Sequence, residues 1–222
     1  MILLYQMDQR IEVIKQWLGT GSINIFGLPF SGKDTIGIHL AELLGAKFLS
    51  SGLILRAAEN EDKELLHEMS AGNLAPTDKF RGIVLPYLTR PDLENFPLVL
   101  SSVGRWGGEE YDVIAAAASG GHPIQAVVLL NVSEAEVKNR WEASKVLQDR
   151  GERKDDESER ILDTRIKEFI EKTMPVIETY RKRELLVPVS ANTDKDSVFN
   201  NVVEGLYEMA MRDQGREIPL NQ

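Results

Sequence analysis

The chain has 222 residues, of which 42% are hydrophobic and 27% charged, a size and balance that suit one folded α/β domain with small insertions. Its net charge of −9 argues against nucleic acid as the main partner, because the phosphate backbone would be repelled overall. The lack of cysteine excludes disulfides, thiolate metal sites and cysteine nucleophiles, and the apolar runs are too short to span a membrane. The first residues carry no basic segment typical of a signal peptide, so we expect a cytoplasmic monomer whose partners are small molecules.

The chain opens with an amphipathic helical pattern over residues 5–18, and we assign residues 1–21 to an N-terminal helical extension. A β-branched run then predicts a strand over about 22–27, and a helical pattern runs from Lys33 to about residue 44. Between strand and helix, Gly27, Gly32 and Lys33 have the G-x-x-x-x-G-K spacing of a phosphate-binding loop. This segment therefore predicts a nucleotide site.

The residue types of this loop suit a polyphosphate. Its glycines let the backbone wrap the ligand with N–H groups pointing inward, the helix N-terminus adds partial positive charge, and Lys33 supplies a full charge for the β- and γ-phosphates. The strict motif has Ser or Thr directly after the lysine, so a glycine-rich turn with an incidental lysine is the alternative. The residues expected to contact the nucleotide are Gly27, Pro29, Ser31, Gly32, Lys33, Asp34 and Thr35. Thr35 is also expected to hold Mg²⁺, directly or through water.

Strands and helices alternate over the rest of the chain. Further strands are predicted over residues 46–50, 96–100, 125–131 and 185–189. Residues 51–90 are helical without a strand signal, and later helices are predicted over 109–119, after Ser133, over 157–182 with a kink at Pro175, and over 196–211. This alternation predicts an α/β fold, a doubly wound, five-stranded parallel sheet with helices on both faces, over residues 22–215. Residues 216–222 are expected to be a flexible tail.

Arginines follow the predicted strands, at the edge of the sheet where ligands of such folds bind. They are Arg56, Arg105, Arg140, Arg150, Arg153 and Arg165. One exposed arginine is usually only a solvated side chain, but several that converge opposite a phosphate loop would stabilise the charge of a transferring phosphoryl group.

The chain resembles the adenylate kinase / nucleoside monophosphate kinase family along nearly its whole length after residue 22. Residues 27–35 are similar to the family's loop, which also places one residue between Lys and Thr. Further segments resemble its motifs in the same order: residues 50–56 (Ser-Ser-Gly-Leu-Ile-Leu-Arg), 69–76, 101–105, 139–140 and 153–156, followed by Arg165. The lid, about residues 145–158, resembles that of the short-lid members, with no room or ligands for zinc.

The resemblance implies a P-loop NTPase fold in which residues 51–90 bind the acceptor and Mg-ATP lies on the loop. It implies transfer of the γ-phosphoryl group to a nucleoside monophosphate, with AMP the expected acceptor. The residues implied in catalysis are Lys33, Arg105, Arg140, Arg153 and Arg165, with Arg140 also on the ATP side. The residues implied in acceptor binding are Ser51, Gly52, Arg56, Arg105 and Glu109.

Three departures from the family pattern leave alternatives open. Ser101 stands where members usually carry an Asp that holds a magnesium-bound water, whereas Asp34 stands where they carry glycine. Asp34 either takes over part of that role or only favours the helix dipole.

Glu109 stands where adenylate kinases carry a Gln that reads adenine. It either accepts hydrogen bonds from a base edge or belongs to a helical turn after a reshaped loop at residues 106–108. In the lid, Arg150 is an alternative to Arg153, and Ser144 stands where a further arginine is expected.

Two other functions compete with this interpretation. One is a kinase of the same fold for another small acceptor, of the shikimate or gluconate type. The other is a catalytically weak nucleotide-binding regulatory protein, suggested by the loss of the Asp at position 101. The set of lysine and arginine residues favours the kinase, because a site without catalysis has no need of them.

Overall fold

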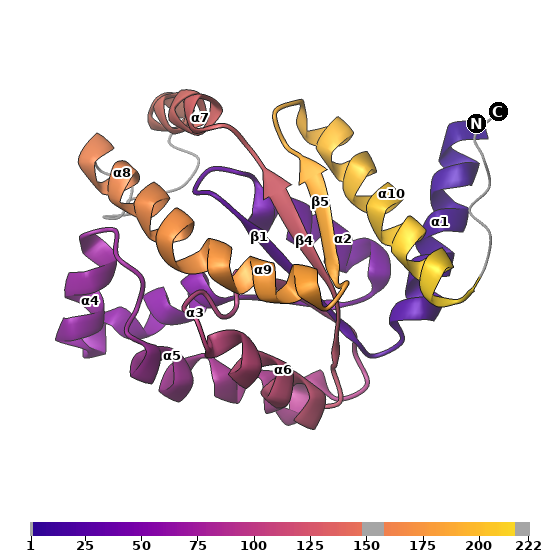
Figure 1. Cartoon of the computed structure of the whole chain (residues 1–222), viewed down its shortest axis with the longest axis horizontal. Helices are drawn as coiled ribbons and strands as arrows, with labels where there is room; N and C mark the ends of the chain where they lie inside the picture. The colour runs from indigo at the N-terminus through magenta and orange to yellow at the C-terminus, as the bar shows by residue number, and fades with distance from the viewer. Residues whose placement is uncertain (1, 148–157, 216–222) are drawn as a thin grey trace.

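The computed structural model describes residues 2–147 and 158–215. Its centre is a five-stranded, wholly parallel sheet in the order β2-β3-β1-β4-β5. The strands are β1 (Ser22–Gly27), β2 (Lys47–Ser50), β3 (Leu98–Ser101), β4 (Ile124–Asn131) and β5 (Leu186–Ser190). The predicted doubly wound parallel sheet is confirmed, with β1 in its middle (Figure 1).

Helices cover both faces of this sheet. On one face α2 (Lys33–Leu44) packs on β1 to β3 and α10 (Lys195–Asp213) on β5, and α1 (Ile2–Leu18) contacts both helices. On the other face lie α6 (Glu109–Ser119) and α9 (Met174–Lys182), which contact each other and β4. The remaining helices, α7 (Glu134–Leu147) and α8 (Glu159–Glu168), precede and follow residues 148–157 (Figure 1).

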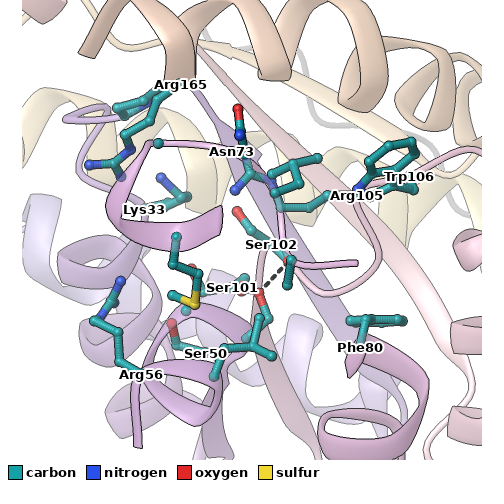
Figure 2. Close-up of a pocket in the computed structure, with 18 of the residues that line it drawn as sticks. Lys33, Ser50, Arg56, Asn73, Phe80, Ser101, Ser102, Arg105, Trp106 and Arg165 are labelled. Carbon is teal, nitrogen blue, oxygen red and sulfur yellow. Dashed lines mark hydrogen bonds between the residues drawn. The ribbon is translucent and has the colours of Figure 1, made fainter. Parts of the chain in front are cut away.

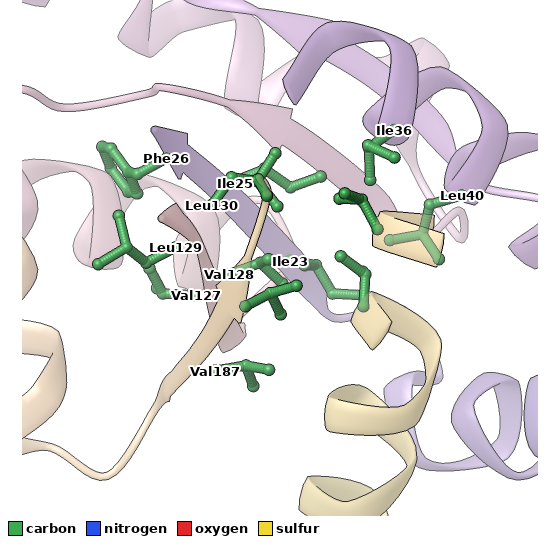
Figure 3. Close-up of a cluster of buried hydrophobic side chains, with 14 of the residues drawn as sticks. Ile23, Ile25, Phe26, Ile36, Leu40, Val127, Val128, Leu129, Leu130 and Val187 are labelled. Atoms are coloured by element: carbon green, nitrogen blue, oxygen red, sulfur yellow. The ribbon is translucent and has the colours of Figure 1, made fainter. Parts of the chain in front are cut away.

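The main core forms because β1 and β4 are apolar on both sides. Ile23, Ile25 and Phe26 of β1 are fully buried, as are Val127 and Val128 of β4, and they meet side chains of α2 and β5 (Figure 3). A central parallel strand covered on both faces requires such a mainly apolar pattern, which the buried Asn24 of β1 interrupts. Burying each such side chain contributes about 1.5–3 kcal/mol.

Residues 51–93 contain helices and no strand, as predicted for residues 51–90, and residues 71–76 form a non-helical connection. Their elements are α3 (Ser51–Ala58), η1 (Glu59–Glu61), α4 (Lys63–Ser70), α5 (Thr77–Ile83), η2 (Leu85–Thr89) and η3 (Pro91–Leu93). Leu55, Leu65 and Phe80 of this segment form a second buried cluster with Leu100 of β3 and Val113 of α6. The insertion is therefore anchored on the side of the sheet formed by β3 and the edge strand β2.

The long helix predicted over residues 157–182 is not continuous. Between α8 and α9 the chain makes a π-helical turn, η5 (Phe169–Thr173). The irregularity lies just before Pro175, which has no N–H to donate to the carbonyl one turn earlier. The other predicted elements are found with their ends shifted by one to three residues.

In the part of the chain that the structure describes, no helix is long and apolar enough to cross a membrane. The predicted lid arginines Arg150 and Arg153, most of the lid and the tail at 216–222 lie outside the described residues.

Candidate functional site

The phosphate loop joins β1 to α2, and its backbone demands the glycines found there. Gly32 adopts a φ of +87°, in the left-handed region that favours glycine, and Phe30 is also left-handed with a φ of +60°. A Cβ atom at Gly27 would lie 2.5 Å from Ser31 Oγ, so only glycine fits. Lys33 begins α2, and its Nζ donates to the carbonyl of Leu28 in the same loop, at 3.3 Å.

The loop after β3 is held beside the phosphate loop by buried polar groups. Asn24 of β1 donates through Nδ2 to the carbonyl of Val103 at 2.7 Å and accepts the N–H of Val103 through Oδ1 at 3.3 Å. Ser51, at the start of α3, donates to the carbonyl of Ser102 at 2.6 Å. Ser102 has a φ of +53°, a strained conformation for a residue with a side chain. These bonds fix the path of residues 101–105 relative to β1 and α3.

These segments surround an open cavity, which is lined by residues of the phosphate loop, the start of α3, the end of β3 and α8. Its cationic side chains come from four separate segments: they are Lys33, Arg56, Arg105 and Arg165. In Figure 2, Arg56, Lys33 and Arg165 lie on one side of the cavity and Arg105 and Trp106 on the other, with Ser101 and Ser102 between them. The structure thus brings together four of the basic residues that the sequence predicts for the site.

Arg105 is the cation whose environment most clearly requires an anion. Burial and then the nearby charge of Arg165 lower its pKa to about 10. Its Nε atom is buried and has no hydrogen-bond partner among the described residues. The charges of Glu168 and Glu109 offset part of this lowering, and a bound phosphate would add a further anion and an acceptor for the Nε–H group.

On the acceptor side, Ser51 and Gly52 line the cavity together with Arg56. A Cβ atom at Gly52 would lie 3.0 Å from Arg56 Nη2, so glycine leaves room for the guanidinium group to fold over the start of α3. The apolar part of the lining consists of Leu55, Met69, Leu74, Ala75 and Phe80. The cavity lining therefore combines cationic and apolar side chains.

Glu109 also lines the cavity, but the protein itself uses both of its carboxylate oxygens. Oε1 accepts from Thr77 Oγ1 at 2.8 Å, and Oε2 accepts the N–H groups of Arg105 and Trp106 at 2.8 and 3.0 Å. The side chain is buried, which raises its pKa, and these three hydrogen bonds partly offset that rise. This arrangement favours the alternative in which Glu109 belongs to the first turn of α6 after a reshaped loop.

Asp34 lies at the floor of the cavity, where α2 passes the end of β3. Ser101 Oγ donates to Asp34 Oδ1 at 2.5 Å, and both residues line the cavity. The described residues hold no cluster of three or more His, Cys, Asp or Glu side chains that would bind a metal alone. Mg²⁺ in kinases usually takes only one or two carboxylates, completing its shell with waters and substrate phosphates, so this donor set fits Mg²⁺ brought by a nucleotide.

Arg140 lies away from the cavity lining, against the outer side of the phosphate loop. It pairs with Glu136 at 2.8 Å and donates to the carbonyls of Phe30 at 3.4 Å and Ala191 at 2.7 Å. These contacts place it beside the phosphate loop, and its predicted roles on the ATP side and in catalysis stay predictions. Thr35 is exposed on the first turn of α2, outside the cavity lining, whereas Ser31 is buried beneath the loop.

Sequence reasoning missed a buried network that ties α8 to the acceptor side. Glu168 Oε2 accepts from the N–H of Leu74 at 3.1 Å and from Lys172 Nζ at 2.6 Å. Lys172, in the π-helical turn, also lies 4.0 Å from the centre of the Trp106 ring. Its only signal in the sequence is an acidic residue on the apolar face of α8, four residues before a lysine.

Comparison with known proteins agrees with this geometry. Residues 26–163 match the family of the AAA domain. An adenylate kinase from Parvibaculum lavamentivorans is 30% identical over 182 residues, which cover 80% of this chain and 88% of that protein. Another, from Nocardioides sp., is 28% identical over 192 residues, with 82% and 95% covered. The chain belongs to the adenylate kinase / nucleoside monophosphate kinase family.

A solved structure of another kinase shares the fold of this chain. A gluconokinase from Sinorhizobium meliloti superposes with a TM-score of 0.60 at 20% identity, covering 88% of this chain and 97% of that one. Such a likeness shows the P-loop kinase fold. Together with the family membership it identifies the chain as a P-loop kinase and leaves its acceptor to be argued from the site.

Proposed function

We propose that this kinase transfers the γ-phosphoryl group of Mg-ATP to a nucleoside monophosphate, with AMP the first acceptor to test. The observation that carries the proposal is that three arginines, Arg56, Arg105 and Arg165, line one cavity together with residues of the phosphate loop. A monoanion needs one guanidinium group, whereas a phosphate dianion that must meet a second polyphosphate needs several cations to offset the repulsion.

The proposed roles follow from position. Lys33 and the backbone of the phosphate loop bind the β- and γ-phosphates of ATP, and Arg56 and Arg105 bind the phosphate of the acceptor. Arg165, which lines the same cavity, stabilises the charge on the group in transit, and Arg140 and Arg153 are proposed to act from the ATP and lid sides. Bound Mg²⁺ would neutralise charge on the β- and γ-oxygens, and Thr35, although outside the cavity lining, stays the residue predicted to hold it or one of its waters.

In the reaction an oxygen of the acceptor phosphate forms a bond to the γ-phosphorus as the bond from that phosphorus to the bridging oxygen breaks. ADP and a nucleoside diphosphate are the products, and no covalent enzyme intermediate is needed. The cations of the cavity supply positioning and charge stabilisation, which are the main requirements of phosphoryl transfer.

The identity of the acceptor base is the part of the proposal that depends on family membership. The apolar lining residues of the cavity, among them Leu55, Met69 and Phe80, suit a flat base in chemical character. Glu109 does not strengthen the choice, since the protein's own groups use both of its oxygens. AMP is proposed because the relatives reported above are adenylate kinases.

The test is the formation of ADP from Mg-ATP in the presence of AMP, dAMP, CMP, UMP, GMP, dTMP or gluconate. We expect turnover with one or a few monophosphates, none with gluconate, and loss of turnover in Lys33→Ala. Turnover with gluconate alone would replace the proposed acceptor class by a sugar acid.

A second candidate, a weakly catalytic nucleotide-binding protein, is favoured by one observation: β3 ends in Ser101 and not in a carboxylate. It predicts ATP binding without turnover of any acceptor in the same panel.

We also propose that the protein acts as a monomer in the cytoplasm. Size-exclusion chromatography with light scattering would check the monomeric state.

A further inference from the structure

We propose that Asp34, held in place by Ser101, is the carboxylate that this kinase presents to the magnesium ion of its nucleotide. The inference rests on the proposed function, because it concerns the metal that accompanies ATP. Asp34 would act directly on the ion or on one of its waters, and Ser101 would be a positioning residue.

The end of the strand beside the phosphate loop is the place where a carboxylate is needed. P-loop enzymes hold Mg²⁺ with a hydroxyl of the phosphate loop and an aspartate near the end of a neighbouring strand. Here that strand is β3, which pairs with β1 so that Ser101 lies opposite Ile25. β3 ends in Ser101, whose side chain is a hydroxyl, and none of the next four residues is Asp or Glu. The next carboxylate, Glu109, already accepts hydrogen bonds from protein donors at both of its oxygens.

The second step is that another carboxylate reaches this position. Asp34 comes from the first turn of α2, one residue after Lys33, and its Oδ1 accepts from Ser101 Oγ at 2.5 Å. A distance of this size is typical of a hydroxyl that donates to an ionised carboxylate. Among the described residues this is the hydrogen bond recorded for the Asp34 side chain, and it engages one oxygen. The other oxygen is left for a ligand in the cavity.

The third step separates this role from the alternative, in which Asp34 only stabilises the positive end of α2. A charge–dipole effect depends on a place in the first turn and needs no partner. The observed side chain is instead joined to the end of another element, and both partners line the nucleotide cavity. A hydroxyl at the strand end and a carboxylate on the helix thus provide together what a single strand-end carboxylate would provide.

The test measures metal-dependent binding and not turnover. Calorimetric titration of a non-hydrolysable ATP analogue, with excess Mg²⁺ and with a chelator, gives the factor by which Mg²⁺ tightens binding. In Asp34→Asn we expect this factor to fall about tenfold or more, the usual effect of removing a metal-supporting group, while metal-free binding is retained. Ser101→Ala should lower the factor less, because the carboxylate remains but is less well oriented.

Two further variants sharpen the result. Glu42→Gln removes an exposed carboxylate from the same helix and should leave the factor unchanged. The exchange Asp34→Gly with Ser101→Asp moves the carboxylate to the strand and should restore much of the factor lost in Asp34→Asn. Thermal melting of every variant reports whether it folds, and if the exchange variant does not fold, Asp34→Asn against Glu42→Gln decides.

If Mg²⁺ tightened binding of the ATP analogue by the same factor in Asp34→Asn as in the wild type, whatever the melting temperature of the variant, the inference would be overturned. Asp34 would then only stabilise the positive end of α2. If the wild-type protein bound no nucleotide in either condition, the proposed function itself would fail. The two failures are therefore distinguishable.

Discussion

Two carboxylates in the cavity occupy equivalent places in their helices and are used in opposite ways. Asp34 and Glu109 both lie in the first turn of a helix that follows a strand, after a left-handed glycine, Gly32 or Gly108. Asp34 accepts one hydrogen bond, from Ser101, whereas Glu109 accepts three, two of them from the backbone just before its helix. The loop decides the difference, because residues 105–106 turn their N–H groups back onto Glu109. Asp34 therefore keeps one carboxylate oxygen for a ligand, whereas the carboxylate of Glu109 holds the loop that carries Arg105.

The largest expected effect comes from removing the cation of the ATP side. Lys33→Ala should lower kcat by about 10²–10³, the usual cost of losing a group that stabilises transferring charge, with little change in melting temperature. Lys182→Ala, at an exposed lysine of α9, is the charge-matched control. Steady-state ADP formation measures both variants, and a Lys33→Ala enzyme within a few-fold of wild type would remove Lys33 from the mechanism.

Arg105→Met tests the acceptor side. It removes a guanidinium group whose pKa is lowered to about 10 by burial and by the charge of Arg165. Because a lowered pKa means that folding disfavours the charged form, the unfolding free energy should stay the same or rise. Acceptor affinity should fall about 10- to 100-fold, as expected for the loss of charge-assisted hydrogen bonds, with ATP affinity retained. Denaturant unfolding and separate titrations of ATP and AMP measure these quantities. Equal loss of ATP and AMP affinity would contradict the assignment of Arg105 to the acceptor.

Glu109→Ala against Glu109→Gln separates support of the loop from reading of the base. Alanine leaves the N–H groups of Arg105 and Trp106 without their acceptor and should cost about 2 kcal/mol of unfolding free energy. Glutamine can still accept from these groups and can donate to Thr77, so it should retain most of the stability and the same order of preference among acceptors. A changed order in Glu109→Gln, measured with the panel of monophosphates, would show that Glu109 reads the base.

The smallest expected effect is a pH dependence of stability from the same residue. Burial raises the pKa of Glu109 in the folded protein above its unfolded value. Its contribution is then fully present below the unfolded pKa and is lost as pH rises through the higher folded pKa. Glu109→Gln should flatten the decline of the unfolding free energy across that interval, measured by urea titration at a series of pH values. An unchanged profile would show that the shift is too small to matter.

The sequence predicts the phosphate-loop side better than the acceptor side, for a physical reason. Gly27, Gly32 and Lys33 are fixed by backbone conformation and close approach, so local spacing reveals them. The partners of Glu109 and Glu168 are set by how distant segments pack, and local spacing carries little information about them. The parallel sheet was predictable from alternation, and the π-helical turn was not, because Pro175 marks a break without specifying its geometry.

The most direct test of the central claim is the binding of a bisubstrate compound in which two adenosines are joined by five phosphates. A cavity that holds ATP and a nucleoside monophosphate end to end should bind it more tightly than ATP, displace both nucleotides, and lose affinity in both Lys33→Ala and Arg105→Met. Binding no tighter than that of ATP, unchanged by Arg105→Met, would show that the cavity holds one nucleotide and would contradict the proposed reaction.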